Sequence, residues 1–101
     1  MAKREPDRKT EYLVRGILSL KTVEECRAFF DDICTITELI DMSNRLTAAK
    51  MLSDEATYTD VIEKTGLSTA TISRVNRCLR YGSDGYRLVL DNLNAAGESP
   101  E

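Results

Sequence analysis

The residues with the most informative chemistry lie between positions 68 and 80, where small hydroxyl side chains are followed by arginines. The polar residues of this stretch are Ser68, Thr69, Thr71, Ser73, Arg74, Asn76, Arg77 and Arg80. Short hydroxyl side chains allow close approach to base edges and phosphates, and guanidinium groups supply positive charge for the phosphate backbone. A helix that only packs in a core has no need of such an outer face. The stretch therefore predicts a surface that binds nucleic acid.

Two short helices joined by a tight turn would hold these side chains in place. The second helix is indicated by Ile72, Val75 and Leu79, whose i, i+3, i+7 spacing places them on one face. Gly66 precedes this pattern, and a turn between packed helices favours a residue that accepts positive φ. Ser68 can cap the second helix by accepting hydrogen bonds from its first backbone N–H groups. The pattern predicts a helix-turn-helix.

We call residues 58–80 the reading unit and its second helix the reading helix. The predicted DNA contacts are Lys64, Ser68, Thr69, Ala70, Thr71, Ser73, Arg74 and Arg77. The three cations would neutralise phosphates, each steepening the salt dependence of binding by about 0.9 in log–log slope, and the small side chains would face base edges. The same glycine and the same apolar spacing would also suit an ordinary helical hairpin in a protein core. The prediction of DNA binding therefore depends on the polar and basic outer face of the reading helix.

Charge is distributed unevenly along the 101 residues, although the net charge is only −3. Residues 58–82 carry four basic and two acidic side chains, and residues 1–21 carry six basic and three acidic ones. Residues 22–57 carry three basic and eight acidic side chains. This pattern fits a specific binder with few phosphate contacts better than a protein that coats nucleic acid.

Several chemistries lack the residues they need. The sequence contains no histidine, which removes the commonest general base and excludes a zinc site of cysteines and histidines. Cys26, Cys34 and Cys78 have no C-x-x-C spacing; we interpret them as small apolar filler, with a redox role for Cys78 as the alternative. We expect no enzyme and no metal site. No apolar run approaches membrane-spanning length and no secretory signal is present, so we expect a cytoplasmic protein.

The rest of the chain predicts an all-α fold of six helices without strands. The helices are expected to begin near residues 10, 22, 35, 57, 68 and 84, and T-x-x-E capping boxes at 22–25 and 35–38 support two of these starts. We divide the chain into a flexible N-terminal arm (1–9), one all-helical domain (10–94) and a frayed tail (95–101).

The apolar stripes of the first helices are too wide for the core of a small monomer. Leu13, Ile17, Leu18, Phe29 and Phe30 would leave a large exposed patch, and such patches mark interfaces. A homodimer that interleaves the first helices and the last helix would cover it. Two reading helices about 34–36 Å apart would also match a palindromic DNA site.

The sequence resembles a known family at several motifs. The run from Ser68 to Arg74 is similar to the start of the reading helix in the Trp repressor superfamily, with its Ala-Thr-Ile-Ser/Thr-Arg core. The stretches 20–26, 29–32, 45–46, 49–52 and 73–79 resemble the YerC/YecD branch of Trp-repressor-related proteins. The resemblance covers about residues 10–93 and implies a six-helix, intertwined homodimer that binds operator DNA and regulates transcription.

The resemblance also implies a ligand site, in which an indole amino acid is held by two arginines and a threonine. By motif position Arg74 matches the second arginine, and Thr35 matches the threonine. Arg45 matches the first arginine if one gap is allowed, whereas an ungapped alignment places Asn44 there. An ion pair of Arg45 with Asp41, at i, i+4 on one helix, is the alternative, and a phosphate contact is the alternative for Arg74.

One link departs from the family pattern. Residues 54–56 contain no glycine, where the family is expected to have a Gly-containing turn. The sequence thus predicts a homodimeric repressor of transcription whose partners are double-stranded DNA and a second copy of the chain. It predicts that no cofactor is required and that a tryptophan-like corepressor can be accommodated. The alternative is a helical protein-interaction module that uses the helix-turn-helix for docking.

Overall fold

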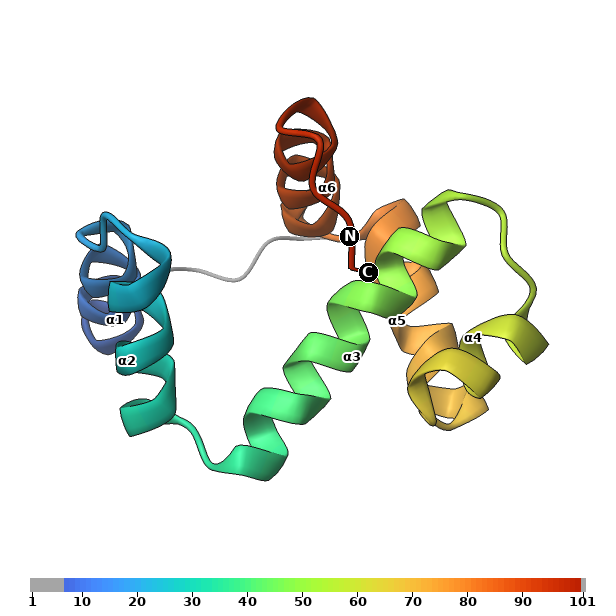
Figure 1. Cartoon of the computed structure of the whole chain (residues 1–101), viewed down its shortest axis with the longest axis horizontal. Coiled ribbons are helices and arrows are strands. Elements are labelled where there is room, and N and C mark those ends of the chain that lie inside the picture. Colours follow the sequence, from blue (N-terminus) through green and yellow to red (C-terminus); the bar gives the residue numbers. More distant parts are fainter. Residues whose placement is uncertain (1–6, 101) are drawn as a thin grey trace. The chain divides into compact units, whose positions relative to one another are not determined.

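The computed structural model describes residues 7–100, which form six helices and no strand, as predicted. The helices are α1 (Arg8–Leu18), α2 (Val23–Ile33), α3 (Ile36–Ser53), α4 (Tyr58–Thr65), α5 (Thr69–Tyr81) and α6 (Gly85–Ala95) (Figure 1). Most of the predicted arm, residues 1–6, lies outside the described residues. The all-α prediction is confirmed.

The first helix begins earlier than the sequence pattern indicated. The carboxylate of Asp7 accepts a hydrogen bond from the backbone N–H of Thr10 at 2.8 Å, which makes Asp7 the N-cap of α1. Asp is a favoured N-cap residue because its oxygen satisfies a backbone donor that has no partner within the helix. Arg8 and Lys9, assigned to the arm from the sequence, therefore belong to α1.

The predicted capping box at 35–38 forms in full, and the one at 22–25 forms with its acidic side chain bonded one residue before the cap. The Thr35 hydroxyl accepts from the Glu38 N–H at 3.0 Å, and the Glu38 carboxylate accepts from the Thr35 N–H at 2.8 Å. At the start of α2 the Thr22 hydroxyl accepts from the Glu25 N–H at 3.0 Å, while the Glu25 carboxylate reaches the backbone N–H of Lys21 at 2.8 Å. These local bonds fix where α2 and α3 begin.

The chain divides into two compact units, one ending at Ile40 and the other beginning at Asp41. In the first unit, no residue of α1 or α2 is buried. The rings of Phe29 and Phe30 pack edge to face, with centroids 5.6 Å apart. This unit therefore leaves most of its apolar side chains accessible.

The second unit contains the hydrophobic core. Its buried apolar residues are Ala48, Ala49, Leu52, Val61, Leu67, Ile72, Val75, Leu79 and Leu90. The i, i+3, i+7 face of the reading helix is thus turned inward, because Ile72, Val75 and Leu79 are all at most 3% exposed. α5 packs against both α4 and α6, so the opposite side of α5 is left for solvent or a partner.

The end of α3 takes a Schellman motif. The N–H of Ala56 donates to the Met51 carbonyl at 3.0 Å, and the N–H of Glu55 donates to the Leu52 carbonyl at 3.1 Å. Glu55 has φ 68°, the left-handed conformation that usually requires glycine at this position. The link from α3 to α4 therefore has the turn geometry expected of a glycine, formed here by a glutamate.

Candidate nucleic-acid interface

The turn of the reading unit is built from three residues between α4 and α5. Gly66 has φ 72°, and its N–H donates to the Ile62 carbonyl at 2.8 Å, which ends α4. Leu67 is buried in the core and anchors the turn. The buried Thr65 hydroxyl donates to the Val61 carbonyl at 2.7 Å and accepts from the Leu67 N–H at 3.2 Å. The direction in which α5 leaves the turn is therefore well determined.

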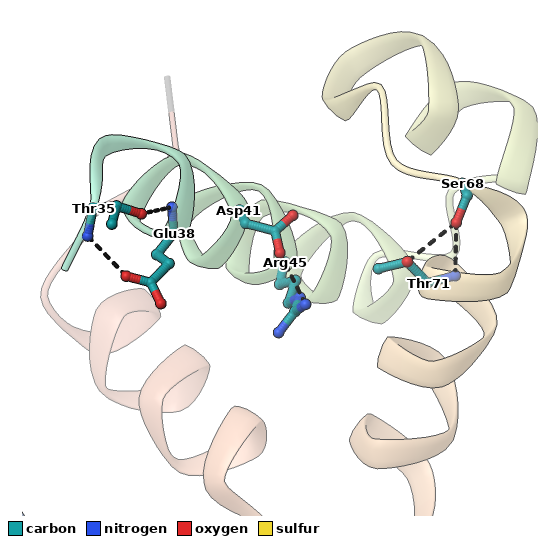
Figure 2. Close-up of polar contacts among 6 residues, drawn as sticks. All are labelled: Thr35, Glu38, Asp41, Arg45, Ser68 and Thr71. Carbon is teal, nitrogen blue, oxygen red and sulfur yellow. Dashed lines mark hydrogen bonds and ion pairs between the residues drawn. The ribbon is translucent and has the colours of Figure 1, made fainter.

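The N-terminus of the reading helix is capped by Ser68, as predicted. The Ser68 hydroxyl accepts from the Thr71 N–H at 3.2 Å and donates to the Thr71 hydroxyl at 3.1 Å (Figure 2). The first turn of α5 carries no acidic side chain. The partial positive charge of the helix N-terminus is therefore left uncompensated there, which favours an approaching anion such as a phosphate.

The predicted DNA contacts lie on accessible parts of the reading unit. The exposed ones are Lys64, Ser68, Thr69, Ala70, Ser73, Arg74 and Arg77. Thr71 is half-buried, and its hydroxyl is engaged by Ser68. Thr71 thus has a capping role that competes with a direct contact to a base.

The two arginines in the middle of the reading helix are not engaged by carboxylates. Within residues 7–100, neither Arg74 nor Arg77 takes part in an ion pair, whereas Arg15, Arg45 and Lys50 do. Charged side chains on an exposed helix face without an internal partner are available to an external anion. Their position on α5 fits contacts to phosphates.

Arg80 differs from the other arginines of the reading helix, although the sequence places all three on its outer side. Its Nη2 donates to the Leu52 carbonyl of α3 at 3.3 Å, and its Nε donates to the Asn76 side-chain oxygen at 3.3 Å. The guanidinium of Arg80 is therefore directed at the end of α3. Sequence reasoning missed this contact because a backbone carbonyl 28 positions away has no side-chain signature.

The residues of the implied ligand site have partners of their own. Arg45 pairs with Asp41 at 2.9 Å, so the i, i+4 alternative is observed, and the Thr35 hydroxyl is the cap of α3 (Figure 2). Thr35 belongs to the first compact unit, whereas Arg45 and Arg74 belong to the second. Each of these contacts explains its residue without a bound ligand.

Tyr86 is a residue that the sequence analysis treated only as an apolar position of the last helix. Its ring is half-buried against the core. Burial raises the pKa of Tyr86 above its usual 10.0, and the charge interaction with Cys78 adds to this, while Arg45 and Arg74 act in the opposite direction. Both arginines of the implied ligand site therefore lie within electrostatic range of this phenol. A ligand held by both would have to share the region with Tyr86.

The cysteines and acidic residues form no further site in the described part of the chain. Cys26, Cys34 and Cys78 are free thiols and half-buried, which is compatible with small apolar filler. Across residues 7–100 no group of three or more potential ligands could hold a metal ion. No helix in that range has the length and apolar character needed to cross a membrane.

Comparison with known proteins places this geometry in a family. The sequence profile of the Trp repressor protein matches residues 8–94, which include both helices of the reading unit. The chain belongs to the Trp repressor family. A relative from Bacillus subtilis (strain 168), the uncharacterized protein YerC, is 52% identical over 83 residues, covering 82% of this chain and 80% of that protein. The predicted YerC-type resemblance is confirmed.

Solved structures have the same fold. A TrpR-like protein from Eubacterium eligens ATCC 27750 has a TM-score of 0.83 and 52% identity, covering 87% of this chain and 91% of that one. A Staphylococcus aureus protein, also named for the Trp repressor, has a TM-score of 0.83 and 44% identity, with 88% and 89% covered. The chain is a DNA-binding regulator of the TrpR type with a helix-turn-helix, and its family is not enzymatic.

Proposed function

We propose that the chain is a sequence-specific repressor of transcription that binds double-stranded DNA as a homodimer. The observation that carries this proposal is the outer face of α5. This face begins at the N-terminus of α5, where Ser68 caps the helix and no acidic side chain offsets its partial positive charge. It continues through exposed small residues to Arg74 and Arg77. Such a face suits a helix that enters the major groove with its N-terminal residues near the bases. Acting on a bacterial chromosome would place the protein in the cytoplasm.

The proposed dimer is supported by the accessibility of the first two helices. Tyr12 is 83% exposed and Leu18 is 82% exposed in α1, and no residue of α1 or α2 is buried. Apolar surface of this kind is characteristic of chains that fold against a partner. A second copy would also supply the second reading helix that a palindromic operator requires.

We further propose that DNA binding does not require a corepressor. Two of the three implied ligand residues already have partners within the chain. Arg45 pairs with Asp41, and the Thr35 hydroxyl caps α3. A tryptophan-like molecule that strengthened binding would have to displace Arg45 from Asp41. The expected effect of added tryptophan on operator affinity is therefore small.

The first test is selection of bound sequences from random duplex DNA at two salt concentrations, with and without tryptophan. We expect a palindromic motif with half-sites about one helical turn apart, recovered equally in both conditions. Enrichment only with tryptophan would overturn the corepressor-free proposal. Failure to enrich any motif, together with recovery of one protein partner after nuclease treatment, would favour the protein-docking alternative.

The second test replaces the phosphate-facing arginines. Arg74→Ala and Arg77→Ala should each weaken binding to the selected operator and lower the salt slope by about 1.8 for a dimer, since two phosphate contacts are lost. Arg87→Ala, in the exposed part of α6, is the matched control and should leave the slope unchanged. The oligomeric state, measured by light scattering, should be the same in all three variants. Unchanged operator binding by both α5 variants would contradict the proposed interface.

A further inference from the structure

Arg80 connects the far end of the reading helix to the end of α3. The donor is Nη2, the acceptor is the Leu52 carbonyl, and the distance is 3.3 Å. The Asn76 side-chain oxygen accepts from Nε at 3.3 Å, so a residue one turn earlier on α5 orients the same guanidinium. The contact therefore uses two edges of the guanidinium and joins two different helices.

The acceptor is well suited to a cation. The Leu52 carbonyl is one of the last four of α3, which have no partner within the helix. It already accepts from the Glu55 N–H at 3.1 Å, and a carbonyl oxygen has a second lone pair for Arg80. The C-terminus of a helix also carries partial negative charge, which favours a guanidinium. Arg80 thus completes the cap that the Schellman motif begins.

This contact adds a polar bond to the apolar packing that already joins α3 to the reading unit. α4 is attached to α3 by the short link 54–56, and α5 leaves α4 through the tight turn at Gly66. With Arg80, the C-terminal half of α5 is bonded directly to the end of α3.

We propose that Arg80 is a positioning residue that fixes the angle of the reading helix to α3 and thereby sets the half-site spacing the dimer accepts. The proposal rests on the proposed function, since half-site spacing has meaning only for a dimer bound to DNA. Arg80 itself contacts no phosphate on this proposal, in contrast to Arg74 and Arg77. That contrast makes the two roles separable by their salt dependence.

The experiment compares Arg80→Ala with Arg77→Ala, the matched arginine one turn earlier. Affinities are measured over a range of salt for the selected operator and for two versions with one base pair inserted or deleted between the half-sites. We expect Arg80→Ala to keep the wild-type salt slope and to lose discrimination between spacings by about tenfold or more, the scale of one hydrogen bond to a charged group. Arg77→Ala should lower the slope and keep the discrimination.

Two outcomes would overturn the proposal. A salt slope lowered by about 0.9 per protomer in Arg80→Ala would identify Arg80 as a phosphate contact. An unchanged slope with unchanged spacing discrimination would show that the bond to Leu52 positions nothing. Asn76→Ala, which leaves Arg80 present but removes its orienting acceptor, gives the same comparison if Arg80→Ala folds poorly, and should show a smaller loss in the same direction.

A measurement on the free protein separates this proposal from the proposed function. Residual dipolar couplings of backbone amides report the angle between α5 and the C-terminal half of α3 without DNA. We expect Arg80→Ala to change or broaden that angle and Arg77→Ala to leave it as in the wild type. If no operator exists but the angle changes as expected, the proposed function fails while the positioning role stands. An angle unaffected by Arg80→Ala would overturn the positioning role itself.

Discussion

Tyr86 is the residue whose environment leads most directly to a measurable pH effect. Burial raises its pKa above 10.0, so the folded chain retains the phenolic proton at a pH where the unfolded chain releases it. The stabilisation that this provides is fully present below pH 10 and is lost as the pH rises through the folded-state pKa. Arg45 and Arg74 oppose the shift without reversing it.

We therefore predict that Tyr86→Phe makes the protein less sensitive to alkaline pH. Unfolding by urea between pH 8 and pH 11 should show a steeper fall in the free energy of unfolding for the wild type than for Tyr86→Phe. Tyr81→Phe is the matched control, because the Tyr81 ring is 71% exposed, and its curve should run parallel to the wild type. Parallel curves for all three proteins would contradict the assignment of the effect to Tyr86.

At the scale of elements, the ends of α3 and α6 share one motif but use different residues. At the end of α6 the Glu98 N–H donates to the Leu93 carbonyl at 2.9 Å, and the Gly97 N–H donates to the Asn94 carbonyl at 3.1 Å. Gly97 has φ 73°. The corresponding residue after α3 is Glu55, with φ 68°. A residue with a side chain is strained in this conformation by about 1–2 kcal/mol, and glycine is not.

Glu55→Gly should accordingly be more stable than Glu55→Ala by about 1 kcal/mol, because alanine keeps the backbone strain and glycine removes it. The greater conformational freedom of glycine in the unfolded chain offsets part of this gain. Denaturant unfolding of the two variants measures the difference. Gly97→Ala provides the mirror experiment and should be destabilised by a similar amount. Unfolding of the glycine and alanine variants of position 55 at the same denaturant concentration would contradict the predicted strain at Glu55.

Signals local to a few residues predicted the elements well. The capping boxes, the spacing of Ile72, Val75 and Leu79, and the Ser68 cap all refer to hydrogen bonds or faces within one or two helical turns, and each is observed. The sequence pattern does not indicate the start of α1, because its N-cap Asp7 lies in a polar stretch typical of a flexible arm. The contacts of Arg80 and Tyr86 were missed because they depend on which helices meet, and no local pattern in this chain encodes that.

At the scale of the whole molecule, the apolar residues are divided between a buried set and an accessible one. The second compact unit buries nine apolar residues, and the helices of the first bury none. A chain of about 100 residues buries roughly two-thirds of its unfolded surface as a monomer. The accessible side chains of α1 and α2 are therefore where association with a second copy would add most to stability.

Leu18→Lys tests this association, since Leu18 is 82% exposed and has little role within one chain. If a second copy covers α1, each protomer loses the burial of one leucine, about 2 kcal/mol, and gains a buried charge. The dimer dissociation constant should therefore rise by about a thousandfold. Analytical ultracentrifugation measures it, while circular dichroism should show unchanged helicity. Thr59→Lys, an exposed position on α4, introduces the same charge and should leave the dimer intact. A dimer equally stable in both variants would place the interface away from α1.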